Sequence, residues 1–513
     1  MPYSPTPHLH RTIQAPDATE IINLRKALRY ATPILHELDD DIAHVQAVLD
    51  KLRRKREPLR KFITKQNTIL APIRRVPTEI LIEIFILCMG YDKSSFSPKR
   101  SPSLVGQVCR GWRQVALSTQ KLWSSITVTS YYRPSSTQAK LWISRASCAP
   151  LAIRLYSENT NIEKIRAVIA VLVQHCDRWR HLDLRIHPTM VPCLSSIKHR
   201  LPWLESLRIQ LPTRHFHELD IFEVAPRLRI LFLGPNILHT MLKVPWHQVK
   251  DLHAHVDTVT KCLETLQLMP NLVKCTIQAS PMSKASILLH DIPILTFPHL
   301  RFFHILQLHP DEIFNNIKLP IIHTLHVSYY NKWKRREDLK WFSRRPFMSL
   351  LSCSSHTLRK LVIDHLDESE DSARIAHCLR ATPSLEELCL RGGSFAWVTA
   401  DLLRQLTRQA NIEVLVPRLE VLEISGYSIP CHHSTSMIES RWRIGDDDDA
   451  GARLKRLHFE MSYMSWVKEW LVDAEILNRL RKCRQEGMVI SIMEDGNFYQ
   501  GDLLDITHSS LVK

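Results

Sequence analysis

One short hydrophobic pattern recurs along most of the chain after residue 150. It reads L-x-x-L-x-L, with other aliphatic or aromatic residues replacing some of the leucines. Most copies start 21 to 28 residues apart, and three intervals are near 35. Alternation with a period of two predicts strands buried on one face, and regular repetition predicts stacked units that share a core. The copies start at Trp179, Leu204, Leu228, Val249, Leu272, Leu300, Ile322, Leu358, Leu385, Leu419 and Leu454.

Prolines precede many of these predicted strands. They are Pro202, Pro226, Pro270, Pro298, Pro320, Pro383 and Pro417. Because proline ends a helix and favours extended backbone, each repeat should contain a loop, a short strand and a return helix. Near the C-terminus, Gly487 is predicted to end a last helix, and "MVISIM" (488–493) to form a last strand.

The residue between the last two hydrophobic positions of each copy should point away from the core. These residues are Asp183, Arg208, Phe232, His253, Thr276, His304, His326, Val362, Cys389, Glu423 and His458. The middle of this row is basic, aromatic and rich in histidine, which suits an acidic or phosphorylated protein segment. Our candidate substrate-binding residues are therefore Arg208, Phe232, His253, His304 and His326. The simpler alternative is that they are solvated strand residues.

Metal and cofactor sites are not indicated. His304 and His326 lie on consecutive repeats and should be about 5 Å apart across the sheet, but no third ligand of suitable spacing accompanies them. "CHH" at 431–433 is interpreted as part of a polar loop. The basic and aromatic insertion at 329–346 is interpreted as a solvated loop or helix, with a nucleic-acid contact as the alternative.

A helical pattern precedes the repeats. From Leu35 to Leu70 a heptad places apolar residues at nine of eleven core positions, which predicts a coiled coil or a helix-packing stripe. Pro58 falls inside this stripe and predicts a break near Glu57. The basic run at 51–56 fits a solvated helix face better than a localisation signal or polyanion site.

A shorter helix is expected before the heptad. Residues 1–16 are polar and rich in proline, and they are followed by Asp17 and Glu20 at the spacing of a capping box. The sequence therefore predicts a loose tail and then a short helix.

Two apolar helices are predicted between residues 77 and 123. In the first, Pro77 suits the opening turn, and apolar residues line both long sides. They are Ile80, Leu81, Ile84, Phe85, Leu87 and Cys88. The second helix lies within "SLVGQVCRGWRQVALSTQKLW" (103–123). A unit this small has little interior, so we expect it to complete its burial against a partner.

These helices resemble an F-box. The similarity rests on "VPTEILIEIF" (76–85), "LVGQVCRGWRQVAL" (104–117) and "LW" (122–123), and it covers residues 71 to 125. Val76 replaces the usual leucine, and residues 90–102 lengthen the loop between the helices. Many fungal proteins carry such a module ahead of leucine-rich-like repeats. The present repeats resemble irregular leucine-rich repeats, although the family's usual asparagine is mostly absent.

The resemblance implies a substrate receptor. Such a module docks on a Skp-type adaptor, and through it on a cullin, in an SCF (cullin-RING) ubiquitin ligase, while the repeats hold a protein substrate. The receptor itself makes no bond. The positions carried over as adaptor contacts are Pro77, Leu81, Ile84, Phe85, Val108 and Trp112. The alternative for each of them is a place in the module's own core.

Charge, motifs and cysteine spacing limit the classes of function that fit this sequence. The formal charge of +16 favours acidic partners, so a scaffold that binds nucleic acid or acidic proteins outside the ligase is the rival function. No Walker loop, GxSxG or HExxH motif occurs, which argues against an enzyme. The 12 cysteines show no CxxC spacing, and neither a signal core nor a membrane-length apolar run occurs. We expect a cytoplasmic or nuclear protein.

The sequence thus predicts an α+β protein with five segments. These are a tail and short helix (1–33), a heptad helix (34–70), an F-box-like helical bundle (71–125), a leucine-rich-repeat-like solenoid with a parallel sheet (126–494) and a tail (495–513).

Overall fold

The computed structural model describes most of the chain. The described residues are 4–7, 10, 15–88, 102–129, 135–157, 162–211, 218–235, 237–279, 293–306, 310–328, 345–364, 369–392, 397–409, 414–426, 428–443, 451–461, 470, 473–494 and 503–505. They belong to two compact units, residues 1–84 and 85–513, and helix α2 (Thr78–Cys88) crosses the boundary. None of the helices in these ranges combines the length and hydropathy needed to span a bilayer.

The first unit consists mainly of one helix, α1 (Ala18–Leu70), of 53 residues. At 1.5 Å per residue it is about 80 Å long. The predicted capping box is confirmed: the amide of Glu20 donates to Asp17 Oδ1 (2.7 Å), and the amide of Asp17 donates to Glu20 Oε2 (2.8 Å). A short 3₁₀ helix, η2 (Pro72–Arg75), follows α1.

The break expected near Glu57 does not occur. The sequence predicted a short helix and a separate heptad helix, but α1 continues through both Pro33 and Pro58. Each proline removes one helical hydrogen bond. Both prolines lie outside the apolar stripe, where solvent can reach the carbonyl that each leaves without a helical partner.

The second unit is built on one parallel sheet. In the described residues it has 14 strands in chain order, one per repeat, as the repeat pattern predicts. The strands are β1 (Ser125–Thr129), β2 (Leu151–Tyr156), β3 (Trp179–Arg185), β4 (Ser206–Ile209), β5 (Ile230–Leu233), β6 (Asp251–Val256), β7 (Lys274–Ala279), β9 (Phe302–Leu306), β11 (Thr324–Ser328), β12 (Lys360–Asp364), β13 (Glu387–Arg391), β14 (Val421–Gly426), β15 (Arg456–Met461) and β16 (Val489–Glu494). β8 (Leu295–Thr296) and β10 (Ile317–Lys318) pair separately.

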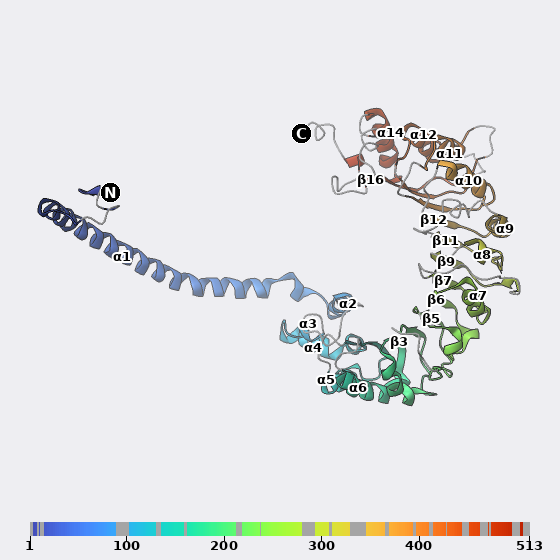
Figure 1. Cartoon of the computed structure of the whole chain (residues 1–513), viewed down its shortest axis with the longest axis horizontal. Helices are drawn as coiled ribbons and strands as arrows, with labels where there is room; N and C mark the ends of the chain where they lie inside the picture. The colour runs from blue at the N-terminus through green and yellow to red at the C-terminus, as the bar shows by residue number, and fades with distance from the viewer. Residues whose placement is uncertain are drawn as a thin grey trace. The chain divides into compact units, whose positions relative to one another are not determined.

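Helices pack along one face of this sheet. Figure 1 shows α7, α8 and α9 on the same side of the strands. Strand residues on that side, such as Leu207, Leu231 and Leu252, are fully buried, whereas the alternate residues on the other side are mostly half-buried. We call this second side the open face. The helices are α3 (Pro102–Val105), α4 (Arg110–Ser118), α5 (Ser136–Ala146), α6 (Ile162–Leu172), α7 (Val259–Gln267), α8 (Pro310–Phe314), α9 (Arg345–Cys353), α10 (Ser369–Arg380), α11 (Ala400–Leu406), α12 (Cys431–Trp442) and α14 (Ala474–Gln485).

Short 3₁₀ helices complete several repeats. They are η3 (Gln120–Trp123), η4 (Val173–Arg178), η5 (Pro188–Ile197), η6 (His239–Met241), η7 (Trp246–Gln248) and η10 (Leu503–Asp505). In repeats without an α-helix, these turns return the chain to the start of the next strand.

The strand predictions are confirmed for all eleven copies of the pattern and for the last strand, β16. Gly487 ends α14 as predicted: its φ is 107°, and the amide of Met488 donates to the Cys483 carbonyl across it (3.1 Å). β1 and β2 were missed, because they precede the first full copy of the pattern. All 12 cysteines are free thiols.

One loop assignment is wrong. "CHH" at 431–433 opens helix α12 instead of lying in a polar loop, and Cys431 is buried there. The insertion at 329–346 lies mostly outside the described residues, since the description resumes at Arg345, the first residue of α9.

Candidate functional site

Helix α2 has two apolar faces with different surroundings. Leu81 and Phe85 are buried, with exposed fractions of 8% and 1%, and so belong to the interior. Ile80, Ile84 and Leu87 are exposed by 52%, 36% and 80%. These three residues follow the i, i+4, i+7 spacing of one helix face. A helix this apolar on its solvent side is typical of a docking surface.

The structure therefore divides the predicted adaptor contacts. Pro77 and Ile84 are accessible, while Leu81 and Phe85 fill the interior. Ile80 and Leu87 were not named as contacts, although their helical spacing from Ile84 was a readable signal.

The second helical segment also exposes apolar residues. Val108, exposed by 62%, follows α3, and Leu104 within α3 is exposed by 44%. Trp112 of α4 is half-buried, and its ring lies 4.9 Å from that of Phe85 between centroids. Cys109 caps α4, because its Sγ accepts the amide of Trp112 (3.4 Å). Val108 is thus available to a partner, and Trp112 contributes to the packing of the module.

Trp123 connects this helical module to the repeats. Its ring is 1% exposed, its Nε1 donates to the Ala116 carbonyl (2.7 Å), and it meets Trp142 of α5 edge-on at 5.1 Å. The guanidinium of Arg145 lies 4.3 Å from the Trp123 ring centre. Two residues later β1 begins the sheet and pairs with β2. The module and the first repeat therefore share a packed interior.

The predicted outward row is confirmed in register across the sheet. Its members pair directly between neighbouring strands, so their side chains form one line across the open face. The full row is Thr127, Arg154, Asp183, Arg208, Phe232, His253, Thr276, His304, His326, Val362, Cys389, Glu423, His458 and Ser491.

Arg208, Phe232 and His253 form a stacked series in this row. The Arg208 guanidinium lies 4.1 Å from the Phe232 ring centre, and the rings of Phe232 and His253 stack at 4.3 Å with a 15° tilt. On the other side, Arg208 lies 3.8 Å from Asp183. Asp183 also accepts the Tyr156 hydroxyl (2.9 Å); burial, and secondly this carboxylate, raise the pKa of Tyr156 to about 12.

A hollow of about 290 Å³ opens beside this series. No Asp or Glu is among the described residues that line it, and its polar lining comes from Arg208, Gln210, His253, His255, Thr276 and Gln278. Gly234 keeps the hollow open, because a Cβ there would lie 2.8 Å from Gln210 Cβ. Guanidinium, imidazole and amide donors suit an anionic side chain, which would compete with Asp183, 3.8 Å from Arg208, and with Asp251, 3.3 Å from His253.

His304 and His326 form a second stacked pair. Their ring centres are 3.8 Å apart, and their planes are within 5° of parallel. His326 Nε2 donates to Asp364 Oδ2 (2.6 Å), whereas His304 Nε2 is shielded from solvent and has no hydrogen-bond partner. Burial, and secondly the adjacent His326, lower the pKa of His304 to about 4. No group of three His, Cys, Asp or Glu residues placed to hold a metal ion occurs in the part of the chain that the structure describes.

The lowered pKa of His304 predicts a pH-dependent stability. Between about pH 6.5 and 4 the unfolded chain binds a proton at this histidine and the folded chain does not, so folding stability falls as the pH falls through this window. His304→Phe keeps a ring that can stack and removes the titration. We therefore expect chemical denaturation of the variant to depend less on pH within this window. The control is His432→Phe, which replaces a histidine whose side chain is 70% exposed; equal slopes for wild type and His304→Phe would contradict the assignment.

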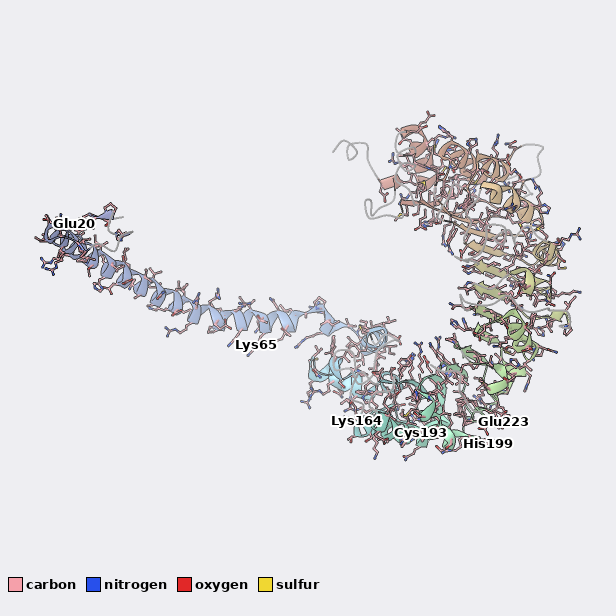
Figure 2. The ribbon with its side chains drawn as sticks, in the orientation of Figure 1. Glu20, Lys65, Lys164, Cys193, His199 and Glu223 are labelled. Carbon is pink, nitrogen blue, oxygen red and sulfur yellow. The ribbon has the colours of Figure 1, made fainter. Side chains whose placement is uncertain are left out.

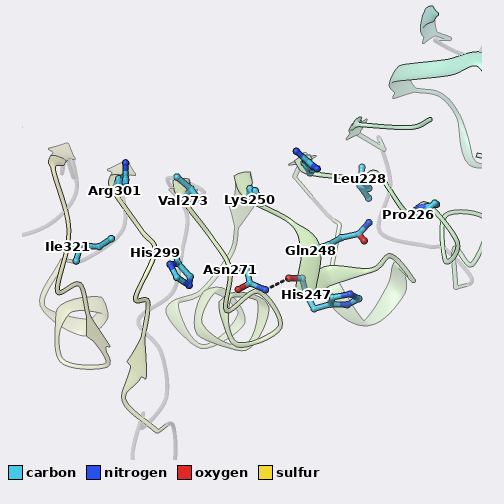
Figure 3. A pocket seen from close by; sticks show the side chains of 11 residues that line it. Pro226, Leu228, His247, Gln248, Lys250, Asn271, Val273, His299, Arg301 and Ile321 are labelled. Carbon is cyan, nitrogen blue, oxygen red and sulfur yellow. Dashed lines mark hydrogen bonds between the residues drawn. The ribbon is translucent and has the colours of Figure 1, made fainter. Parts of the chain in front are cut away.

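A larger groove, of about 540 Å³, runs along the edge where the central strands begin (Figure 3). Its lining includes Arg229, Lys250 and Arg301, together with His247 and His299. All five side chains are exposed, and none of them forms an ion pair with a described residue. Asn271 donates to the His247 carbonyl (2.8 Å) at the base of the groove.

In the outer repeats, the basic residue at the same position of the pattern forms an ion pair. There the basic residue that follows the first hydrophobic position pairs with a glutamate of the next or preceding repeat. The pairs are Arg180–Glu205 (2.7 Å), Arg359–Glu386 (3.4 Å) and Lys455–Glu420 (2.8 Å). Lys250 and Arg301 occupy this position in the central repeats without such a glutamate, whereas Arg229 follows the repeat of Glu205, whose carboxylate pairs with Arg180. In the described part of the chain, the central edge therefore gathers three exposed cationic side chains that form no ion pair.

Comparison with known proteins gives a family match for one segment of the chain. Residues 73–129 match the F-box-like family. The match contains α2, α3 and α4, and it ends at the last residue of β1. No curated protein matches the chain.

Proposed function

We propose that this chain is a substrate receptor of an SCF (cullin-RING) ubiquitin ligase. Its F-box-like domain docks on a Skp-type adaptor, which connects it to a cullin, and its leucine-rich-like repeats hold a protein substrate. The proposal rests mainly on one observation: within the segment that matches the F-box-like family, α2 leaves Ile80, Ile84 and Leu87 exposed. F-box domains generally bind Skp-type adaptors through apolar helices of this kind.

The receptor acts by position and makes no bond itself. Trp123 and β1 join the helical module to the first repeats through a packed interior. In this proposal the packed junction joins α4 of the helical module to the repeats that hold the substrate. Holding a substrate lysine near a charged ubiquitin carrier raises its effective concentration, which is the whole catalytic contribution that we assign to this chain. We place it in the cytoplasm or nucleus, in agreement with its free thiols.

We propose that the repeats bind an acidic or phosphorylated segment of the substrate protein. Arg208, Phe232 and His253 line the open-face hollow, and Arg229, Lys250 and Arg301 line the edge groove. Both sites belong to the central repeats, and no carboxylate lines either of them in the described residues. His304 and His326 extend the open-face site, where their stacked rings offer an apolar surface.

Adaptor binding is tested with the full chain and a purified Skp-type adaptor. Ile84→Asp and Val108→Asp place carboxylates on exposed apolar positions, so the fold should persist while docking is lost. We expect each change to weaken binding by about 30-fold or more, the size of an interface hot spot. Isothermal calorimetry or a surface-binding assay measures the affinity.

Leu141→Asp is the matched control, because Leu141 of α5 is exposed by 47% but lies outside the matched segment. It should bind like the wild type. Leu81→Asp is unsuitable, since it would put a carboxylate into the interior. A folded wild-type chain that fails to bind the adaptor would overturn the proposal.

The alternative is a repeat scaffold that binds nucleic acid or acidic proteins outside the ligase. The unpaired cations of the edge groove favour it. Binding of duplex DNA or RNA with a steep salt dependence, together with no adaptor binding, would select this alternative.

A further inference from the structure

Helix α1 carries an apolar stripe that nothing in its own unit covers. None of its residues is buried, and Figure 2 shows its side chains projecting all around the helix between Glu20 and Lys65. The heptad core positions are exposed by 43% to 65% at Leu28, Leu35, Leu38, Ile42, Val45, Leu49, Leu52, Leu59, Ile63 and Leu70. A helix this long is normally stabilised by packing of its apolar face, so the stripe calls for a partner.

The stripe is wider than two positions per heptad. With Leu35 at position a and Leu38 at position d, the g positions include Ile34, Val48, Phe62 and Ile69, which are exposed by 41% to 59%. The two prolines fall at outer positions: Pro33 at f and Pro58 at c. The inner side of α1 is therefore mostly apolar, and Arg56 and Gln66 are its polar core positions.

Charge along α1 is separated in a way that opposes parallel pairing with a second copy. Asp39, Asp40 and Asp41 lie in its middle, and a basic run from Lys51 to Arg56 follows. In a parallel pair Arg56, at position a, would face its own copy in the core, and Lys55 at g would face Arg60 at e of the partner. Both contacts bring like charges together.

We propose that two copies of this chain associate through α1 as an antiparallel coiled coil. The register that pairs Ile42 with Leu52 of the second copy, and Val45 with Leu49, overlaps the helices from Leu24 to Leu70. In this register Asp39 faces Arg53 of the second copy across the e positions, and Asp41 faces Lys55 across the g positions. Twofold symmetry repeats both pairs.

The other flanking contacts of this register are also compatible. At the g positions Ile34 faces Phe62, Ala27 faces Ile69, and Val48 faces its own copy. Arg56 faces Leu38 instead of another arginine. Shifting the second copy by one heptad, so that Ile42 pairs with Val45, would instead put Arg25 opposite Arg60 and Ile34 opposite Lys55. Charge complementarity thus favours this antiparallel register over the shifted one.

The first measurement is the mass of the full chain by sedimentation or light scattering. We expect twice the chain mass of 59.7 kDa. The variant Asp39→Arg with Asp41→Lys replaces four attractive contacts by four repulsive ones, and so does Arg53→Asp with Lys55→Asp. Each variant should weaken dimerisation by about 100-fold, because each of the four contacts changes from an attraction to a repulsion of a few tenths of a kcal/mol. Circular dichroism and the melting of the repeats report that each variant is folded.

Mixing the two variants provides the decisive test. Every reversed charge of one then faces an opposite charge of the other, so equimolar mixing should restore a dimer. The matched control is Asp40→Arg with Arg54→Asp, at outer f positions, which should remain dimeric. Val48→Cys should form a disulfide-linked dimer on oxidation, because only the antiparallel register places this position opposite itself. A monomeric wild type, a trimer, or charge variants that dimerise like the wild type would overturn the proposal.

Discussion

Replacing Arg441 with methionine should lower the free energy of unfolding of the C-terminal repeats by about 3 kcal/mol or more. Arg441 is fully buried on α12 and donates to three carbonyls: Nε to Leu406 (2.6 Å), Nη2 to Leu415 (2.6 Å) and Nη1 to Val416 (3.1 Å). It thus joins the end of α11 to the segment before β14. Methionine fills much of the same space but removes the donor to the Leu406 and Leu415 carbonyls, while the Val416 carbonyl keeps the amide of Leu419 (3.2 Å).

The surroundings of Arg441 explain why no other residue replaces it. Val416 has a φ of 45°, a strained conformation for a β-branched residue, and its carbonyl is one of the three acceptors. Burial, and secondly the charge of Arg408, lower the pKa of Arg441 to about 9, so the side chain is still charged at neutral pH. Arg441→Lys keeps a charge but offers one point donor in place of a planar fork, and should recover only part of the stability.

Local measurements are needed, because repeats unfold in sections. Hydrogen exchange of β13, β14 and β15 should accelerate in Arg441→Met, while β3 and β4 keep their protection. Arg443→Met is the control: its side chain is 47% exposed, and a surface change of this kind costs about 0.5 kcal/mol or less. Unchanged exchange near β14 would show that the three carbonyls do not depend on Arg441.

The repeats were predictable because their information is local and redundant. Eleven copies of one pattern placed every strand of the main sheet from β3 to β15 and fixed which residue of each points outward, so the pairing of Asp183 with Arg208 or of His304 with His326 followed directly. β1 and β2 alternate in the same way but lack the leading part of the pattern. Pro58 misled the prediction for α1, because it lies at an outer position of the helix, where solvent can reach the carbonyl that it leaves without a helical partner.

The chemistry of the candidate sites was less predictable. Helical spacing showed that α2 is apolar on two sides, but only the packing decides that Leu81 and Phe85 face inward and Ile80, Ile84 and Leu87 face outward. The charge of the edge groove depends on which repeats lack a glutamate partner, which is a comparison between neighbours in space. Arg441 has no distinguishing mark in the sequence, because a buried and an exposed arginine look alike there.

Trp123→Ala should destabilise the junction between the helical module and the repeats by about 3 to 5 kcal/mol. The ring is 1% exposed, so its removal leaves a cavity beside Trp142 and takes away the donor to the Ala116 carbonyl. The loss should appear first as faster hydrogen exchange in α4 and β1. Trp203→Ala is the control: that ring is exposed by 49%, so its removal should lower the free energy of unfolding by about 1 kcal/mol or less.

Trp123→Phe separates packing from hydrogen bonding at the same position. It keeps an aromatic ring against Trp142 and loses the Nε1 donor, so we expect an intermediate cost of about 1 to 2 kcal/mol. If the repeats hold a substrate at a fixed distance from the adaptor, Trp123→Ala should also lower substrate ubiquitination more than it lowers adaptor affinity, because the adaptor contacts on α2 are untouched. Equal losses in both would mean that Trp123 supports the docking helices themselves and not the rigid connection between the two functions.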